Sequence, residues 1–311
     1  FRGGFFPGGV IQTAAVSAVD IALWDLKGKA LGVPVYELLG GRTRDKVVCY
    51  PHIGGRHDLD ELVKCARQAV EEGWKFVRWG MCDPAGSDVL EPSRAVRFGI
   101  EQVRVVREAV GDEIGICFDV HTRLDPPSAI EFCKGVEPYR PFFVEDPLRS
   151  EGPGSLRLLR QQTSVPIAVG EQWDSKWRFQ QAIEEDLLDY LRVDLGIVGG
   201  LTEAKKIAGW GETHYIHLAP HAPGGTVATA AALHLCLSSP LVGVCELPGP
   251  PMTSLTDVFP KQMPFQDGHL LVPGGPGLGI DFDEKAMEEA ETLTYGKGTG
   301  FLRDDGSYTN W

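Results

Sequence analysis

The fold is decided by ICFDVH at residues 116–121, FFVEDP at residues 142–147 and IAVGEQ at residues 167–172. Each stretch is a short run of apolar residues that ends in an acid, and these acids follow one another at 26-residue steps. Three more stretches continue the series at similar steps: LRVDLG at 191–196, LAPHAP at 218–223 and GVCELP at 243–248. Such a step holds one strand and the helix that crosses back to the next parallel strand. The series therefore predicts an α/β fold.

Eight candidate strands alternate with amphipathic helical stretches. The strands are expected at Val47–Ile53, Lys75–Gly80, Ile114–Val120, Pro141–Asp146, Pro166–Glu171, Tyr190–Leu195, His214–Pro220 and Leu241–Leu247. The helices are expected at Asp60–Glu72, Arg94–Val110, Ala129–Val136, Lys176–Leu187, Thr202–Gly209 and Thr226–Leu237. Eight strands with helical crossovers in roughly 250 residues predict a (β/α) barrel of the TIM type. A doubly wound open sheet is the alternative, but no glycine-rich phosphate turn favours it.

Other segments flank the predicted barrel. Thr13–Leu31 is predicted to be a helix whose apolar face carries Val16, Val19, Ala22 and Leu26. Residues 248–311 are rich in Gly and Pro and too irregular for another barrel unit, with one helical patch near Glu284–Leu293. We therefore divide the chain into an initial segment with the first barrel helix (1–45), the barrel with the active site (46–247) and a C-terminal tail (248–311). The tail is expected to pack on the barrel or on a further domain.

Composition excludes several classes of protein. The net charge is −13 and no Lys/Arg block could follow a phosphate backbone, which argues against nucleic acid and an anionic membrane surface. No apolar run reaches the roughly 20 residues that span a bilayer. Seven scattered cysteines without a CxxC pair are typical of reduced core thiols in a cytoplasmic protein. The chain begins at Phe1 without a signal pattern, which we interpret as a truncated or unobserved start.

The acids at the strand ends predict a metal site. Asp119, Glu145 and Glu171 end adjacent strands, and active sites of barrels lie at the carboxyl ends of their strands. Three carboxylates without Cys suit a hard divalent cation, Mg²⁺ first and Mn²⁺ second. Taken singly, each acid could instead be a helix cap or a solvated loop end. Their equal spacing after apolar strands favours the metal site.

Two histidines and one further acid complete the predicted ring. An aspartate on the neighbouring strand, Asp194, would hold His221 in one tautomer and make it a base; a histidine bonded only to backbone is the alternative. His121 follows Asp119 by two residues, so both side chains share a face if the strand continues. His121 could then protonate a leaving hydroxyl, or serve as a wall residue or extra ligand. Glu246 would hydrogen-bond a developing enediolate if protonated, or orient the substrate.

This set of groups suits removal of a proton next to a carboxylate. That proton is very weakly acidic, because its loss creates a dianionic enediolate. A divalent cation together with preorganised donors stabilises such a charge. A Lys or His base combined with Mg²⁺ is the arrangement used in the enolase superfamily.

The chain resembles the mandelate racemase subgroup of the enolase superfamily, most closely its acid-sugar dehydratases of the D-galactonate type. The resemblance covers nearly all of the sequence. It is carried by AVDIALWDLKGKALGVPVYELLGG (18–41), DVH (119–121), VEDP (144–147), VGE (169–171), APHAPGG (219–225), GPGLGID (275–281) and DGSYTNW (305–311). It implies a barrel whose N-terminal capping domain is largely absent from this chain.

The resemblance also implies roles for the residues of the ring. The implied Mg²⁺ ligands are Asp119, Glu145 and Glu171, the base dyad is Asp194–His221, His121 is the acid that expels the 3-hydroxyl, and Glu246 is the eighth-strand carboxylate. Arg78 and Trp173 are expected to contact substrate. Racemases of this group carry Lys-x-Lys on the second strand, whereas KFVRWG places Arg78 and Gly80 there. The missing second base favours dehydration.

The resulting prediction is a Mg²⁺-dependent lyase that dehydrates an aldonate or aldarate to a 2-keto-3-deoxy acid. An epimerase, racemase or lactone cycloisomerase of the same superfamily is the first alternative. A non-catalytic enolase-like scaffold is the second, but such a protein would be expected to lose ligands or the base, and none is missing. We expect a small-molecule partner and a homo-oligomer in the cytoplasm, without nucleic acid or membrane.

Overall fold

A computed structural model describes residues 8–86, 88–289 and 301–309. The chain forms two compact units, each built from separate stretches of sequence. The first unit comprises Phe1–Tyr50, Gly170–Glu184 and Leu191–Thr292. The second comprises Pro51–Val169, Glu185–Tyr190 and Leu293–Trp311.

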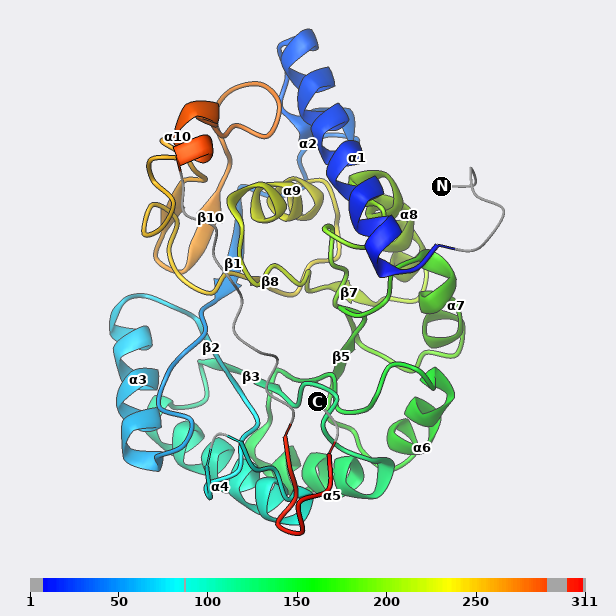
Figure 1. Ribbon diagram of the computed structural model, residues 1–311, viewed down its shortest axis with the longest axis vertical. Coiled ribbons are helices and arrows are strands. Elements are labelled where there is room, and N and C mark those ends of the chain that lie inside the picture. The colour runs from blue at the N-terminus through cyan, green and yellow to red at the C-terminus, as the bar shows by residue number, and fades with distance from the viewer. Residues whose placement is uncertain (1–7, 87, 290–300, 310–311) are drawn as a thin grey trace. The chain divides into compact units, whose positions relative to one another are not determined.

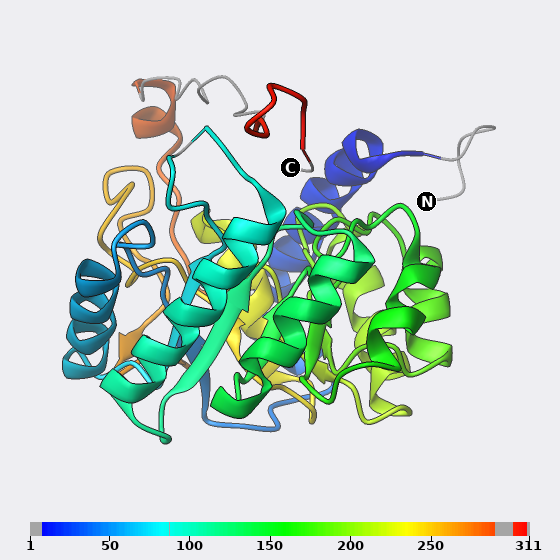
Figure 2. The ribbon, with the colours of Figure 1, turned by 90° about the horizontal axis from the view of Figure 1, so that it is seen from below.

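The second unit contains four parallel strands that lie side by side in chain order. They are β2 (Phe76–Gly80), β3 (Gly115–Asp119), β4 (Phe143–Glu145) and β5 (Ile167–Val169). The register pairs Gly80 with Asp119 and Asp119 with Glu145, so the carboxyl ends of β2, β3 and β4 are level. The crossover segments are α3 (Leu59–Glu71), α4 (Pro92–Val110), α5 (Pro126–Val136), η1 (Glu137–Tyr139), η2 (Pro153–Ser155) and α6 (Leu156–Arg160). Figure 2 shows α4 and α5 side by side over the strands.

Local sequence explains where these helices begin and what they cover. A proline is the first residue of both α4 and α5, where the missing N–H costs no hydrogen bond. The Asp58 side chain caps α3 by accepting a hydrogen bond from Glu61 N at 2.9 Å. Under the helices, Phe118 of β3 packs on Phe132 of α5 with ring centres 4.7 Å apart. Burying such a ring contributes about 2–3 kcal/mol, which fixes the helices on the strands.

The first unit contains the other parallel strands. Ala219 N donates to Leu191 O (3.0 Å), Leu218 bridges Val242, and β8 (Cys245–Glu246) pairs in parallel with β1 (Lys46–Tyr50). The order is thus the end of β6 (Tyr190–Leu191), β7 (His217–Leu218), β8 and β1. The helices of this unit are α1 (Val10–Leu31), α2 (Val35–Leu38), α7 (Lys176–Glu184), α8 (Gly200–Glu212), α9 (Thr226–Leu237) and α10 (Glu284–Glu289).

Helix α1 packs on α8, but not through the predicted face (Figure 1). The apolar face expected from Val19 and Leu26 is wrong, because these side chains are 60% and 63% exposed. The buried face instead carries Ile21 and three small or polar residues, among them Ser17. Its Oγ accepts hydrogen bonds from Gly199 N at 2.9 Å and Gly200 N at 3.1 Å. Close approach to these backbone amides, rather than apolar area, therefore decides which face is buried.

The segment after β8 is more regular than predicted. Phe265–Gln266 (β9) and His269–Leu271 (β10) form a hairpin, and β10 pairs antiparallel with β1. The two turn residues, Asp267 and Gly268, have φ of +47° and +73°. Asp-Gly is a strong hairpin signal because both central residues of a type I′ turn need positive φ, so the sequence did contain the cue. In the second unit, Leu302 of the same tail bridges Val89.

All eight predicted strands and the predicted helices are present, although most strands are shorter than expected. Residues 290–293 of the predicted helical patch and Asn310–Trp311 of the closing motif lie outside the described residues. All seven cysteines are free, and six are buried. Within the described ranges, no helix is long and apolar enough to cross a membrane. The cytoplasmic location and the homo-oligomer stay predictions.

Candidate active site

Two predicted metal ligands lie together at the strand ends of the second unit. Asp119 and Glu145 are paired in the register of β3 and β4, and both are fully buried. The guanidinium of Arg78, from β2, forms an ion pair with Asp119, and its Nε lies 3.9 Å from Glu145 Oε2. Buried carboxylates need a compensating cation. In this arrangement Arg78 provides one.

His121 reaches Asp119 by a turn rather than by a continued strand. Strand β3 ends at Asp119, and His121 and Thr122 have φ of +52° and +58°. The turn places His121 Nε2 2.6 Å from Asp119 Oδ2, while His121 N donates to Asp119 Oδ1 at 2.7 Å. Burial favours a raised pKa for Asp119, but the charges of His121 and Arg78 and the hydrogen bonds from His121 outweigh it, so this pKa lies below its usual range.

Asp194 and His221 form a hydrogen-bonded pair in the first unit. Asp194 Oδ2 lies 2.7 Å from His221 Nδ1, and its Oδ1 accepts from Gly196 N at 2.6 Å. Because the carboxylate only accepts, the Nδ1 position carries the proton and Nε2 is the basic nitrogen. A short parallel bridge between the two residues sets their spacing.

Glu171 and Glu246 face the other side of the same imidazole. His221 Nε2 lies 3.7 Å from Glu171 Oε2 and 3.9 Å from Glu246 Oε2. Glu246 Oε2 also accepts from Ala222 N at 3.0 Å. The first unit therefore gathers three carboxylates around one histidine.

Arg192, which was not predicted from the sequence, is fully buried in this group. Its Nη2 lies 2.6 Å from Glu246 Oε2 and 3.7 Å from Glu171 Oε2, and its Nη1 donates to Ala219 O at 2.7 Å. Arg192 Nη2 and Ala222 N both donate to Glu246 Oε2, so this oxygen is an acceptor here, and the role of Glu246 stays a prediction. Arg192 precedes Asp194 by two residues, and alternation along a strand puts both on one face. This two-residue spacing is the sequence signal that could have identified Arg192 as a site residue.

The predicted metal ligands are divided between the units, with Asp119 and Glu145 in the second and Glu171 in the first. Among the described residues, no three His, Cys, Asp or Glu side chains form a group that could hold an ion. The chemistry of the donor set nevertheless fits a hard cation. Asp119 and Glu145 offer only oxygen, are buried, and attract the positive charge of Arg78.

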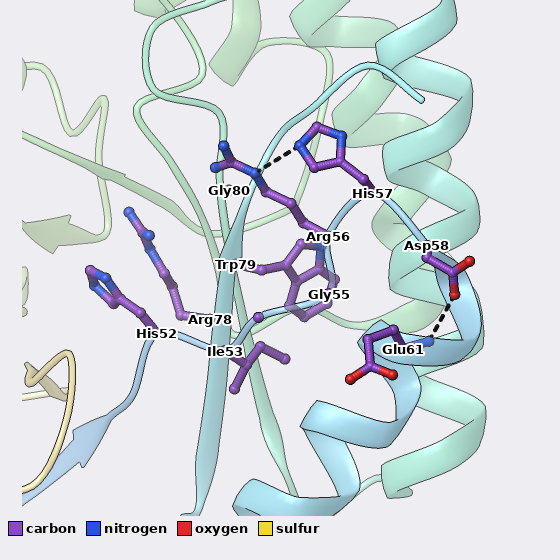
Figure 3. A pocket seen from close by; sticks show the side chains of 11 residues that line it. His52, Ile53, Gly55, Arg56, His57, Asp58, Glu61, Arg78, Trp79 and Gly80 are labelled. Carbon is purple, nitrogen blue, oxygen red and sulfur yellow. Dashed lines mark hydrogen bonds between the residues drawn. The ribbon is translucent and has the colours of Figure 1, made fainter. Parts of the chain in front are cut away.

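The two predicted substrate contacts have different surroundings. Arg78 lines a cavity of about 480 Å³ in the second unit, formed by residues 52–58, Glu61 and the end of β2 (Figure 3). Trp173 is buried in the first unit, where its ring packs edge-on against Phe179 with centres 4.8 Å apart. This packing accounts for the burial of Trp173, and its contact with substrate stays a prediction. The loop at 52–58 was not predicted from the sequence to line a site.

Comparison with known proteins identifies the family. Residues 61–286 match the enolase C-terminal domain-like family, and residues 5–40 match the mandelate racemase/muconate lactonizing enzyme N-terminal domain. A D-galactonate dehydratase of Ralstonia nicotianae is 36% identical over 321 residues, covering 100% of this chain and 82% of that protein. The D-galactonate dehydratase family member RspA of Pantoea ananatis is 36% identical over 313 residues, covering 90% of this chain and 75% of that protein.

A solved structure is equally similar. The crystal structure of an enolase from Pantoea ananatis, with bound D-gluconate and Mg, has a TM-score of 0.90 and 32% sequence identity, covering 98% of this chain and 81% of that one. The predicted α/β fold of the enolase superfamily is confirmed. The dehydratases among the relatives are hydro-lyases, so the predicted lyase class is confirmed as well. The chain belongs to the mandelate racemase/muconate lactonizing enzyme family of the enolase superfamily.

Proposed function

We propose that the chain is a Mg²⁺-dependent dehydratase of a sugar acid, an aldonate or aldarate. It removes the C2 proton and eliminates the 3-hydroxyl, giving a 2-keto-3-deoxy acid. The observation that carries this proposal is the pair of histidines that carboxylates hold in place, His221 by Asp194 and His121 by Asp119. Relatives named D-galactonate dehydratase support it.

Asp119, Glu145 and Glu171 would hold the Mg²⁺ ion. When bound, the ion supplies positive charge that stabilises the negative charge developing on the substrate carboxylate. The arrangement of Arg78 supports this assignment, because its guanidinium is the cation paired with Asp119 in the described residues. The bound Mg of the Pantoea ananatis enolase supports it further.

His221 acts as the base. Its Nδ1–H donates to Asp194, so Nε2 accepts the C2 proton of the substrate. The resulting imidazolium is stabilised by Asp194 at 2.7 Å and by Glu171 and Glu246 within 4 Å. Arg192 offsets part of that negative charge, and its backbone contacts keep Glu246 in place.

His121 acts as the acid. It donates a proton to the departing 3-hydroxyl, which leaves as water when the C3–O bond breaks. The remaining enol takes up a proton at C3 and becomes the 2-keto-3-deoxy acid. The backbone turn at His121 and Thr122 holds the imidazole beside Asp119 without help from the strand.

The experiment is incubation of a sugar-acid panel with Mg²⁺ in D₂O, followed by proton NMR, for the wild type and two variants. We expect His221→Asn to abolish both dehydration and exchange of the C2 proton. His121→Asn should lose at least about 10²–10⁴-fold in dehydration and retain slow exchange, because His221 still removes the proton. Exchange that survives in His221→Asn and vanishes in His121→Asn would show that base and acid are interchanged.

The same panel separates the alternative reactions. Deuterium at C2 with every hydroxyl retained would indicate an epimerase, whereas a 3-deoxy-2-keto product indicates dehydration. The second strand supports dehydration, because Arg78 pairs with Asp119 and Gly80 has no side chain that could act as a second base.

A further inference from the structure

The cavity of the second unit has one wall formed by a tight turn at Gly55–Asp58. Asp58 N donates to Gly55 O at 2.9 Å, which makes Arg56 and His57 the two corner residues. Gly55 has a φ of +81°, and a Cβ there would lie 2.6 Å from Leu62 N. Glycine is therefore required at this position, and the turn is held against the start of α3.

The backbone of Arg56 is anchored from beneath by buried side chains. Its carbonyl oxygen accepts hydrogen bonds from Gln102 Nε2 and, at 2.9 Å, from Cys82 Sγ. Gln102 is fully buried and is held by Trp79, whose Nε1 donates to Gln102 Oε1 at 3.2 Å. A loop that is fixed in this way presents its side chains at defined positions.

The guanidinium of Arg56 is directed over Gly80, toward His121. Arg56 Nε donates to His57 Nε2 at 3.5 Å (Figure 3). His57 Nδ1 lies 3.3 Å from Asp83 O. The position that a Cβ on Gly80 would occupy is 3.5 Å from Arg56 Nη1 and 3.4 Å from the His121 ring. Because Gly80 has no side chain, a space remains between the Arg56 guanidinium and His121, the proposed acid.

Arg56 offers an uncompensated positive charge to the cavity. Its side-chain contact within the described residues is to His57, and no carboxylate there lies within ion-pair distance. The two acids that line the cavity are engaged elsewhere, since Asp58 caps α3 and Glu61 pairs with Lys64 at 3.2 Å. His52, His57 and Arg78 are the other basic side chains of the lining.

Arg56, Arg78 and Arg123 lie near enough to one another for their positive charges to interact. The pKa of Arg123 is lowered to about 10, chiefly by burial; the charge of Asp119 opposes this lowering, and the nearby charges of Arg56 and Arg78 contribute to it. An anionic group would relieve this repulsion. The overall charge of −13 offers no long-range attraction to an anion, so a local cation is needed to bind one.

We propose that Arg56 binds the distal carboxylate of a six-carbon dicarboxylic sugar acid, so that the enzyme prefers hexarates to hexonates. This inference rests on the proposed function, because it places C3 of the substrate at His121 and the rest of the chain beyond it. A planar guanidinium forms two parallel hydrogen bonds with a carboxylate and cannot do so with a terminal hydroxymethyl group. His57 is a positioning residue that holds Arg56 Nε. The cavity volume of about 480 Å³ is in the range of small-molecule sites.

The test compares galactarate with D-galactonate, which differ at C6 alone. Affinities are measured by calorimetry with Mg²⁺ in the His221→Asn background, where ligand is not consumed. We expect galactarate to bind at least about 10-fold more tightly, and Arg56→Ala to remove this preference by weakening galactarate binding about 10–100-fold. Galactonate affinity should change less than about 3-fold. Arg56→Lys should retain part of the preference. Arg104→Ala, which removes a half-buried arginine paired with Glu101 and Glu108, is the matched control and should change the affinity for neither ligand.

The outcomes distinguish the two proposals. The assignment of Arg56 would be overturned if both acids bound equally well, or if Arg56→Ala lowered the affinity for both acids equally. This holds even if the wild type dehydrates sugar acids. A preference that depends on Arg56, in a wild-type enzyme that dehydrates neither acid, would support the assignment and refute the proposed reaction. His57→Ala should weaken galactarate binding less than Arg56→Ala does. An unchanged affinity for galactarate in His57→Ala would show that His57 does not position Arg56.

Discussion

His234 should make the stability of the protein depend on pH between about 4 and 6.5. The side chain is fully buried in α9, where burial lowers its pKa from 6.5 to about 4. Its Nδ1 accepts a hydrogen bond from Tyr36 N at 3.0 Å, so the Nε2–H donates to Leu278 O at 3.1 Å. These two bonds need the neutral ring, and protonation would destroy the first of them.

The direction and size of the effect follow from linkage. Below pH 6.5 the unfolded chain binds a proton at His234 that the folded chain does not, so the free energy of unfolding falls as the pH falls. Because one pKa unit is worth about 1.4 kcal/mol, the loss should approach about 3 kcal/mol near pH 4. The stabilisation is fully present above pH 6.5.

The assay is urea unfolding of metal-free wild type and His234→Gln between pH 4 and 7.5. The His234→Gln variant should be less stable than the wild type at pH 7, since glutamine cannot make both hydrogen bonds, but residue 234 then no longer titrates. The difference between the two proteins should therefore shrink by about 3 kcal/mol as the pH falls from 7 to 4. Parallel stability curves would show that folding does not lower the pKa of His234. Circular dichroism of both proteins at pH 7.5 would control for a change of fold.

Three further predictions concern the dyad, the metal and a glycine. Asp194→Asn should keep the fold but lower turnover by about 10³–10⁴-fold in steady-state assays, because the amide favours the wrong tautomer of His221; near-normal turnover would show that His221 does not depend on Asp194. Removal of divalent ions with EDTA should abolish dehydration, and Mg²⁺ should restore it; activity that persists in EDTA would contradict the assigned ligands. Gly277→Ala should lower the free energy of unfolding in urea by about 2–3 kcal/mol, because Gly277 has a φ of +69° and its Cβ would collide with Asp25 Oδ1; an unchanged midpoint would show that the segment relaxes.

The positions of the elements could be predicted from local sequence. Apolar runs that end in Asp119, Glu145 and Glu171 recur because each strand is buried on both faces and its chemistry lies at its end. The spacing of these acids was therefore enough to locate the strands and the candidate site residues. The Asp-Gly turn of the β9–β10 hairpin was a local signal too, hidden by the Gly- and Pro-rich surroundings.

Contacts between distant residues depended on the tertiary structure. Arg192 and Glu246 are 54 positions apart, and nothing local indicates that a buried guanidinium fixes this carboxylate. The buried face of α1 was likewise decided by the amides of Gly199 and Gly200, which the periodicity of the helix does not contain.

Local sequence was thus enough to place the acids and His221 at or within three residues of the strand ends, and to indicate the family and the class of chemistry. Only the tertiary structure revealed that the turn at Arg56 lies across Gly80 from His121, because that proximity comes from the packing of one strand beside the next. Patterns along a chain record burial and strand length, which repeat. The direction of the Arg56 guanidinium depends on the particular residues packed around it. Those contacts occur once in the fold, so no repeating pattern in the sequence predicts them.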